Sequence, residues 1–327
     1  MSITNEIERL QTAKETLKTK LNAKNDSEHQ ITNELISEYG NFVDNISTGV
    51  DIDEYFKDTI SAGTSVNPGW KSTIKKLRSP LKIEGTSAAY MFSAYPLSKF
   101  PEINTSEVTD MSYMYFNCKS NGEINNLNTS KVTNTNGMFQ QSNVVINCEL
   151  DMSNVTNMEN MYYDFRMKIP KMNNVTKVKT MKQTFYNSSF STSLDLSSFN
   201  TSELTNLYKT FYYCINLTDL NIHFDASKVI NMYDMFGITY KLTNLNFMYN
   251  VGKGFSTSES ANNSNYRVVV STCDKLTHDS LMSIINGLYD IASLGIKTQQ
   301  VFLGSTNLAK LTSEEIAIAT NKGWTVG

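Results

Sequence analysis

The stretch NTSEVTDMSYM at residues 104–114 decides the fold, because the chain repeats its pattern, most clearly as VTNMENMY at residues 155–162. With the valine of each stretch as position zero, methionine stands at positions three and six and an aromatic residue at position seven. The pattern has six clear copies at spacings of 24, 23, 23, 26 and 25 residues, and a worn copy begins at Gly85. Such a repeat indicates a solenoid in which each copy forms one coil.

Each copy contains two hydrophobic periods. Positions zero, three, six and seven lie on one face of a predicted short helical segment. Leu217, Leu220 and Ile222 then give the L-x-x-L-x-L step of a turn that feeds a short strand. We expect an α/β leucine-rich-repeat solenoid of about seven repeats of 23–26 residues. Its predicted core residues are Val108, Met111, Met114, Val132, Met138, Val155, Met158, Met161, Val178, Met181, Leu204, Leu207, Val229, Met232 and Met235.

Residues 1–60 have the pattern of a helical attachment region. A heptad-like stripe with charged flanks favours a coiled coil that joins copies of the chain, as a homotrimer. The alternative is a single helix packed on its own chain. A second helix is expected over residues 31–46, and a third helical piece around Tyr55, Phe56 and Ile60. The predicted oligomerisation residues are Ile3, Ile7, Leu10, Leu17 and Leu21.

The remaining boundaries follow from where the repeat begins and ends. Residues 61–83 are expected to be a linker and N-terminal cap, residues 84–250 the solenoid, and residues 251–327 a C-terminal β-α cap. The elements expected in that cap are strands over residues 266–270 and 301–304 and helices that begin near His278 and Ser313.

The composition narrows the classes of function. The net charge of -3 and the 19% of charged residues give no basic field for nucleic acid. No apolar stretch reaches the 18 residues of a membrane span, and the first residues lack the apolar core of a secretory signal. Asn, at 37 of 327 residues, is expected at the corners of the coils, where its side chain bonds the backbone.

The repeat resembles the BspA-like leucine-rich repeats, which occur in bacterial surface proteins and in structural proteins of phages that infect Gram-positive bacteria. The flanks are similar to those of the phage proteins. IERLQTAK at residues 7–14 and ISEY at 36–39 look like the N-terminal helices of tail and fibre proteins, and LGSTNLAKL at 303–311 and ATNKGW at 319–324 look like their closing cap. The resemblance implies a virion protein, made in the host cytoplasm.

The sequence shows no pattern of catalytic or metal-binding residues. His278, Asp279 and Ser280 are triad residue types, but adjacent residues do not give that geometry, and a helix N-terminus is the better interpretation. Asp51 and Asp53 indicate a solvated helix start rather than a cation site. Cofactors are not expected, nor is an enzyme. The four cysteines are too dispersed for a zinc site or a disulfide scaffold, and Cys118 and Cys214 are expected to be buried apolar residues.

Aromatic residues are the remaining candidates for a binding site. One per coil belongs to the core, and the extra one either covers a sheet edge or forms an exposed ladder for stacking on sugars. The candidate surface-binding residues are Tyr115, Phe116, Tyr162, Tyr163, Tyr186, Tyr212 and Tyr213.

Taken together, the sequence predicts a non-enzymatic phage virion protein, a fibre or baseplate adhesin. Residues 1–60 would attach it to other virion proteins, and the solenoid would bind a glycan or protein of the host cell surface. Nucleic acid and membrane insertion are not expected. A purely architectural virion protein and a bacterial cell-surface adhesin are the two alternatives.

Overall fold

The computed structural model describes residues 56–61, 76–95, 100, 102–119, 121–189 and 191–327. The chain divides into two compact units, one of Met1–Asp58 with Gly69–Arg78 and one of Thr59–Pro68 with Ser79–Gly327. The second unit contains the repeats and most of the described residues. The predicted coiled coil, with Ile3, Ile7, Leu10, Leu17 and Leu21, lies outside the described residues.

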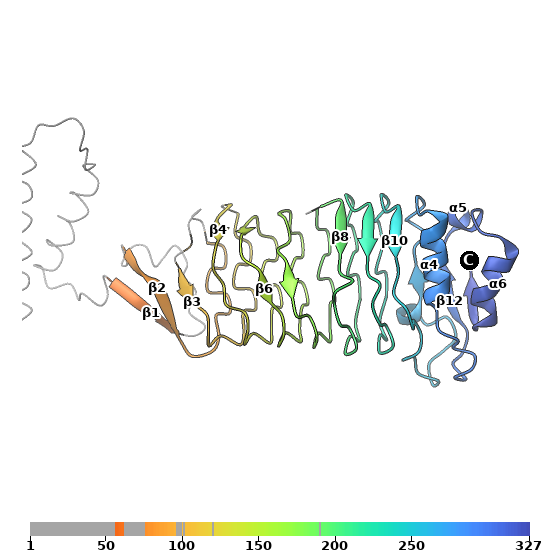
Figure 1. The fold of residues 1–327 in the computed structure, drawn as a ribbon, viewed down its shortest axis with the longest axis horizontal. Coiled ribbons are helices and arrows are strands. Elements are labelled where there is room, and N and C mark those ends of the chain that lie inside the picture. Colours follow the sequence, from red (N-terminus) through yellow and green to blue (C-terminus); the bar gives the residue numbers. More distant parts are fainter. Residues whose placement is uncertain (1–55, 62–75, 96–99, 101, 120, 190) are drawn as a thin grey trace, which may run out of the picture. The chain divides into compact units, whose positions relative to one another are not determined.

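Short parallel strands follow one another along the second unit (Figure 1). Each coil contributes two or three residues to a strand, since it turns away after crossing the sheet. The elements in chain order are β1 (Phe56–Ser61), β2 (Lys76–Glu84), β3 (Ile103–Asn104), β4 (Glu123–Ile124), β5 (Val145–Ile146), β6 (Leu150–Asp151), β7 (Met172–Asn173), β8 (Ser193–Asp195), β9 (Asp219–Asn221), β10 (Asn244–Asn246), η2 (Ser264–Tyr266), β11 (Val268–Val269), α4 (His278–Gly287), β12 (Gln299–Phe302), α5 (Ser305–Leu308), α6 (Ser313–Asn321) and β13 (Trp324–Val326).

The coils are joined in register. A parallel ladder of single bridges links position two of every copy to position two of the next, through Ser87, Asp110, Asn134, Asn157, Thr180, Asn206 and Asn231. The L-x-x-L-x-L step forms a second ladder, in which Leu194 of β8 pairs with Leu220 of β9, and Leu220 with Leu245 of β10. Repeated short parallel strands confirm the predicted repeat solenoid.

The predicted helical segment at positions zero to seven is wrong, because the structure has consecutive turns there. Residues at positions five and nine of all seven copies have positive φ, between 50° and 63°, which no α-helix tolerates. Alternate N–H groups point to the next coil: those of Met111, Tyr113 and Tyr115 donate to carbonyls one coil on over 2.8–2.9 Å. The left-handed residues are Tyr90, Tyr113, Gly137, Asn160, Gln183, Lys209 and Asp234 at position five and Ala94, Asn117, Gln141, Asp164, Asn187, Tyr213 and Ile238 at position nine.

Position seven forms a continuous stack of buried aromatic rings through the array. Neighbouring ring centroids lie 5.4–5.9 Å apart, and successive ring planes differ by 3–19°. Every ring is at most 1% exposed, so the stack is the axis of the hydrophobic core. Its members are Phe92, Tyr115, Phe139, Tyr162, Phe185, Phe211 and Phe236.

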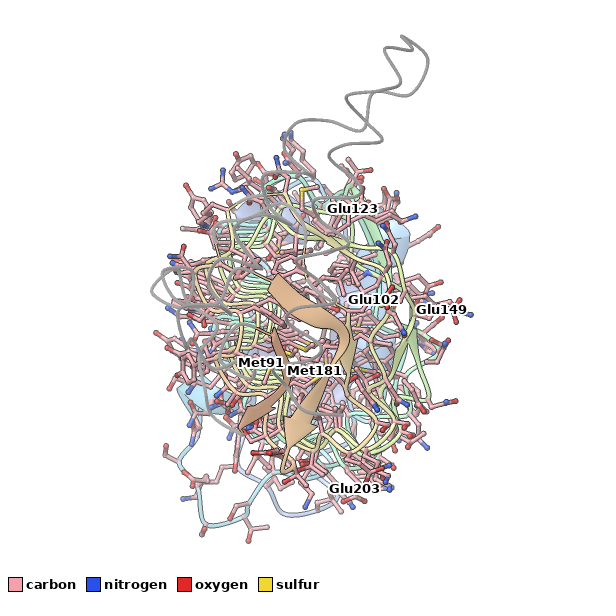
Figure 2. The ribbon with its side chains drawn as sticks, turned by 90° about the vertical axis from the view of Figure 1, so that its left-hand side faces the viewer. Met91, Glu102, Glu123, Glu149, Met181 and Glu203 are labelled. Atoms are coloured by element: carbon pink, nitrogen blue, oxygen red, sulfur yellow. The ribbon has the colours of Figure 1, made fainter. Side chains whose placement is uncertain are left out.

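The aliphatic and methionine side chains of positions zero, three and six surround this stack. The fifteen residues named above as the repeat core are each at most 3% exposed. Where threonine replaces methionine, its hydroxyl bonds a backbone carbonyl, as Thr184 Oγ1 does to Met158 O over 2.8 Å. The end-on view of Figure 2 places Met91 and Met181 inside the coils and Glu149 and Glu203 at the surface.

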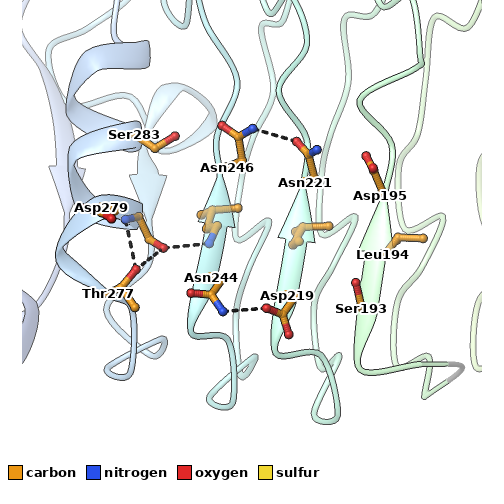
Figure 3. Close-up of a pocket in the computed structure, with 13 residues that line it drawn as sticks. Ser193, Leu194, Asp195, Asp219, Asn221, Asn244, Asn246, Thr277, Asp279 and Ser283 are labelled. Carbon is orange, nitrogen blue, oxygen red and sulfur yellow. Dashed lines mark hydrogen bonds between the residues drawn. The ribbon is translucent and has the colours of Figure 1, made fainter.

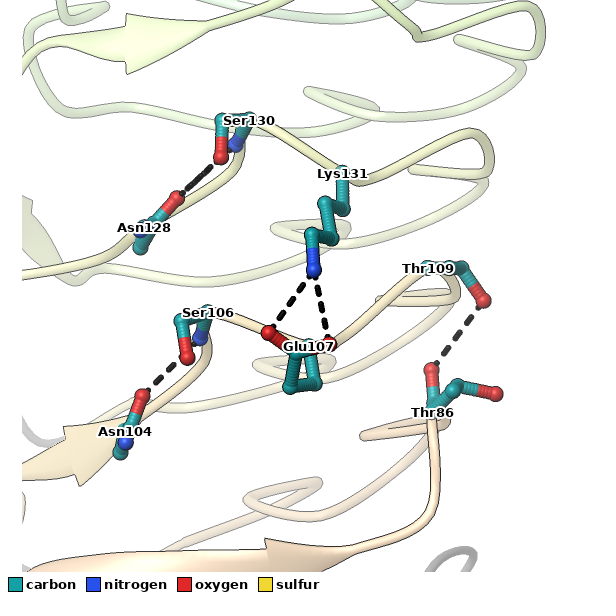
Figure 4. A network of polar contacts seen from close by, with 8 residues as sticks. All are labelled: Thr86, Asn104, Ser106, Glu107, Thr109, Asn128, Ser130 and Lys131. Atoms are coloured by element: carbon teal, nitrogen blue, oxygen red, sulfur yellow. Dashed lines mark hydrogen bonds and ion pairs between the residues drawn. The ribbon is translucent and has the colours of Figure 1, made fainter.

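Asparagine and aspartate hold the corners. At position two the side-chain oxygens of Asp110, Asn134, Asn157, Asn206 and Asn231 accept the N–H two residues on, over 2.9–3.1 Å. A second corner repeats this bond, for example from Ser106 N to Asn104 Oδ1 (Figure 4). Exposed ion pairs between coils, such as Lys131 with Glu107 at 2.7 Å, lie between the two corners. The Asn excess is therefore structural, since each coil needs the same bonds.

The ends of the array differ from the coils. Residues 56–61 form strand β1, so the helical piece expected around Phe56 and Ile60 is wrong there. At the other end the predicted helices and strands are present, and α4 takes the place of a further coil. The side-chain hydroxyls of Ser280 and Ser283 accept the N–H groups of Leu245 and Phe247, over 2.8 and 2.7 Å, and so cap the open edge of β10.

Replacing Tyr162 by phenylalanine should stabilise the protein. The Tyr162 hydroxyl is buried and has no hydrogen-bond partner, and five of the seven stacked rings are phenylalanine already. Removing the unpaired hydroxyl is expected to raise the free energy of unfolding by about 1 kcal/mol, measured by urea denaturation. An unchanged or lower value would show that the hydroxyl is satisfied.

The Ser280→Ala substitution should have the opposite effect. It leaves the Leu245 N–H, at a buried strand edge, without a partner, and a loss of about 1–3 kcal/mol is expected in the same measurement. Ser258→Ala, at an exposed serine, is the matched control and should change stability by less than about 0.5 kcal/mol. Equal effects of the two substitutions would contradict the capping role of Ser280.

Candidate interaction surface

Tyrosine side chains form a ladder on the outer face of the turns. Tyr163, Tyr186 and Tyr212 occupy position eight of three consecutive copies and are half-buried. Their ring centroids are 4.6 and 5.0 Å apart, with ring planes 3° and 11° from parallel. The rings thus cover one another's faces and present edges and hydroxyls outward. Burial is the main cause that raises the pKa of Tyr163.

A second, shorter column of tyrosines lies beside the ladder in the last two copies. Tyr208 and Tyr233, at position four, stack at 5.5 Å and 13°. Lys209 Nζ lies 4.6 Å from the ring centroid of Tyr212 and 5.6 Å from that of Tyr208, so one cation joins the two tyrosine columns. Tyr213, which is 40% exposed, lies beside Tyr212 with centroids 6.5 Å apart.

The candidate binding residues therefore separate into two groups. Tyr115 and Tyr162 are at most 1% exposed and belong to the buried stack, so their inclusion among surface-binding residues is wrong. Position seven points into the coil, and the following residue at position eight points out. Phe116 is half-buried at position eight and packs edge-on against Tyr113, with centroids 5.8 Å apart.

A shallow groove crosses the outer face of β8, β9 and β10 and ends at α4 (Figure 3). Asn244 Nδ2 donates to Asp219 Oδ1 over 2.6 Å, and Asn246 Nδ2 to Asn221 Oδ1 over 3.0 Å. Hydrogen bonds from Thr218 and Asn244 lower the pKa of Asp219. The groove offers carboxylates, amides and hydroxyls, which suit polar ligands. Its lining residues are Ser193, Leu194, Asp195, Asp219, Leu220, Asn221, Asn244, Leu245, Asn246, Thr277, Asp279, Ser280 and Ser283.

A second groove opens where the outer ladder of strands is interrupted. Among the described strands β5 pairs only with β4, and β8 only with β9, while residues 167–171 between them form no strand. Ile146, Met172 and Phe199 contribute apolar lining, and Lys171 Nζ lies 3.3 Å from Glu149 Oε1. Neither groove is predictable from the repeat pattern of the sequence.

His278 and Ser280, whose residue types also occur in catalytic triads, make structural contacts here. His278 Nε2 lies 2.8 Å from Glu315 Oε1 and links α4 to α6, and Ser280 caps β10. Asp51 and Asp53 lie outside the described residues. Within the described part of the chain, no group of three or more His, Cys, Asp or Glu side chains is placed to hold a metal ion. No helix among the same residues is both long enough and apolar enough to span a membrane.

The four cysteines are free thiols in different surroundings. Cys118 and Cys214 occupy position ten, are fully buried, and donate to the carbonyls of Phe92 and Phe185 over 2.9 and 3.0 Å. Burial raises the pKa of Cys118 to about 11 and those of Cys214 and Cys273 to about 12. Cys148 is half-buried, and burial raises its pKa too.

One thiol per folded chain should therefore react with a thiol reagent such as dithionitrobenzoate. Cys148 is expected to react at neutral pH and faster as the pH rises to about 9, because the thiolate is the reactive form. The three buried thiols have raised pKa values and are shielded from the reagent, so they should react only after unfolding in denaturant, which is the control. Rapid reaction of more than one thiol in the native protein would contradict the burial described here.

The fold defines a class of protein, the leucine-rich-repeat-like solenoids with a C-terminal β-α cap. The chain matches the family model described as "Mycoplasma protein of unknown function, DUF285" over residues 86–173 and over residues 146–250. These matches together span half of the chain, which belongs to this leucine-rich-repeat-like family. The match does not show the phage origin that the flanking segments predicted. No curated protein and no solved structure gives a significant match.

Proposed function

We propose that this chain is a non-enzymatic recognition protein, an adhesin whose solenoid presents a contact surface to a partner on a cell. The observation that supports this best is the tyrosine ladder of Tyr163, Tyr186 and Tyr212 on the turn face. Tyrosine supplies contact area at a low cost in side-chain entropy, and is enriched where proteins bind other molecules. A ladder repeated over consecutive coils gives an extended surface for weak contacts that add up.

Two settings for such an adhesin are compatible with the chain. In the first, residues 1–60 join several copies and attach them to other proteins of a phage virion, as the resemblance of the flanking segments suggests. In the second, the protein is displayed on a bacterial cell, which the match to a family described from Mycoplasma favours. Joining several copies would in either case multiply weak single-site affinities.

Binding of the full-length protein to intact cells tests the proposal. Fluorescently labelled protein is titrated to about 10 μM on cultured animal epithelial cells and on Gram-positive bacteria, and bound label is measured by flow cytometry. Saturable binding to one panel is expected, with half-saturation at or below the micromolar range. Absence of saturable binding to both panels would contradict the adhesin and favour an architectural protein.

A matched pair of variants connects the binding to the ladder. Replacing Tyr163, Tyr186 and Tyr212 together by serine should weaken binding at least tenfold, since interface tyrosines often contribute 1–2 kcal/mol each. Tyr249→Ser, at an exposed tyrosine outside the ladder, should leave it unchanged. Equal binding by both variants would remove the ladder from the proposed surface.

A further inference from the structure

Apart from Tyr90 in the first copy, the large exposed apolar side chains of the described repeats lie at one end of the array. Between Met91 and Tyr212 none of the described large apolar residues is exposed, whereas five are exposed between residues 213 and 240. These five side chains are 37–46% exposed. They are Tyr213, Ile230, Tyr233, Ile238 and Tyr240. The coils share one backbone geometry, so this concentration is a property of the side chains and not of the fold.

Two of these residues occupy an unfavourable backbone conformation. At position nine the earlier copies have Ala, Asn, Gln, Asp and Asn, residues that are small or polar. The last two copies have Tyr213 at φ 63° and Ile238 at φ 60°. A bulky or β-branched residue is disfavoured in the left-handed region. Both are exposed, so the packing within the coil does not explain them. Exposed strain of this kind is typical of functional positions.

Ring contacts and a backbone hydrogen bond join Tyr213, Tyr233 and Ile238 with Tyr208 and Tyr212 into one surface. Tyr233 stacks on Tyr208, Lys209 lies over the rings of Tyr208 and Tyr212, and Tyr212 lies beside Tyr213. The Tyr213 N–H donates to the Gly237 carbonyl over 2.7 Å, which sets Ile238 in the adjacent coil next to Tyr213. We call Tyr208, Tyr212, Tyr213, Tyr233 and Ile238 the aromatic patch.

The chemistry of the aromatic patch favours a protein over a saccharide. Saccharides pack their C–H groups on open ring faces, but Tyr208 and Tyr233 each cover one face of the other, and Tyr186 covers one face of Tyr212. An isoleucine adds little to a sugar site and much to a protein interface. Lys209, which lies over the rings of Tyr208 and Tyr212, is 3.9 Å from Asp234, so the patch offers no unpaired cation to a sulfated or phosphorylated polymer.

We infer that the aromatic patch is the docking site for the apolar surface of a partner protein. The inference rests on the proposed function, and deepens it by naming the partner class and the residues at its centre. Tyr213 and Ile238 are the central anchors, and the ion pair Lys209–Asp234 contributes to the polar rim. Apolar anchors within a polar rim are the usual arrangement of a protein–protein contact.

The double variant Tyr213→Asn/Ile238→Asn tests the inference in the cell-binding titration described above. Asparagine is the residue that Asn117 and Asn187 supply at position nine, so thermal unfolding should occur at the wild-type temperature or above it. Binding should nevertheless weaken at least tenfold. Tyr90→Asn, a substitution of an exposed left-handed tyrosine in the first copy, is the matched control and should bind as the wild type does.

Treating the cells before the titration identifies the partner class. Mild protease treatment should abolish binding, and periodate oxidation of surface glycans should leave it intact. Binding that survives protease and is lost after periodate would replace the protein partner by a glycan. If the double variant binds as the wild type does, the docking role of the aromatic patch is wrong but the adhesin function stands. If the wild type does not bind at all, both are wrong.

Discussion

The buried stack of aromatic rings is the contact on which the rest of the structure depends. Each ring packs on the ring of the previous coil and of the next, at 5.4–5.9 Å, and therefore fixes how far apart neighbouring coils lie. That spacing is close to the distance between paired strands, about 4.8 Å, so backbone hydrogen bonds form on the outside while the rings pack inside. A coil has no such partner by itself, which is why the fold needs an array.

The constraint that orders the core also organises the surface. Because positions five and nine are left-handed in every copy, the backbone between them presents residues four, five, eight and nine outward in each coil. A residue type that recurs at one of these positions becomes a column, as tyrosine does at position eight. Differences in residue type between copies therefore change the surface of the turn face, while the backbone beneath it hardly changes. This is how the aromatic patch can occupy two copies without altering the solenoid.

The sequence predicted the repeat well and its local geometry less well. Spacing and residue type were enough for the register, since Val108 and its counterparts recur at nearly constant intervals. They were not enough to distinguish turns from a helix, because positions zero, three, six and seven suit both, and the left-handed Tyr113 or Lys209 is not a residue that signals a turn. For the same reason Tyr115 and Phe116 looked equivalent, although one is buried and the other is not. The grooves could not be predicted from the sequence, because they depend on where the ladder of paired strands is interrupted.

The ladder of bonds between coils determines how the array responds to tension. Backbone hydrogen bonds along the turns, the corners and the strands hold each coil to its neighbours, and α4 protects the edge of the last one. A force that pulls the ends of the array apart would unfold the coils one at a time, beginning at an end. Each unfolded coil would add roughly 75–85 Å of extended chain to the length of the protein. In the proposed adhesin, an array that lengthens by steps under load would keep hold of a bound partner while the load falls.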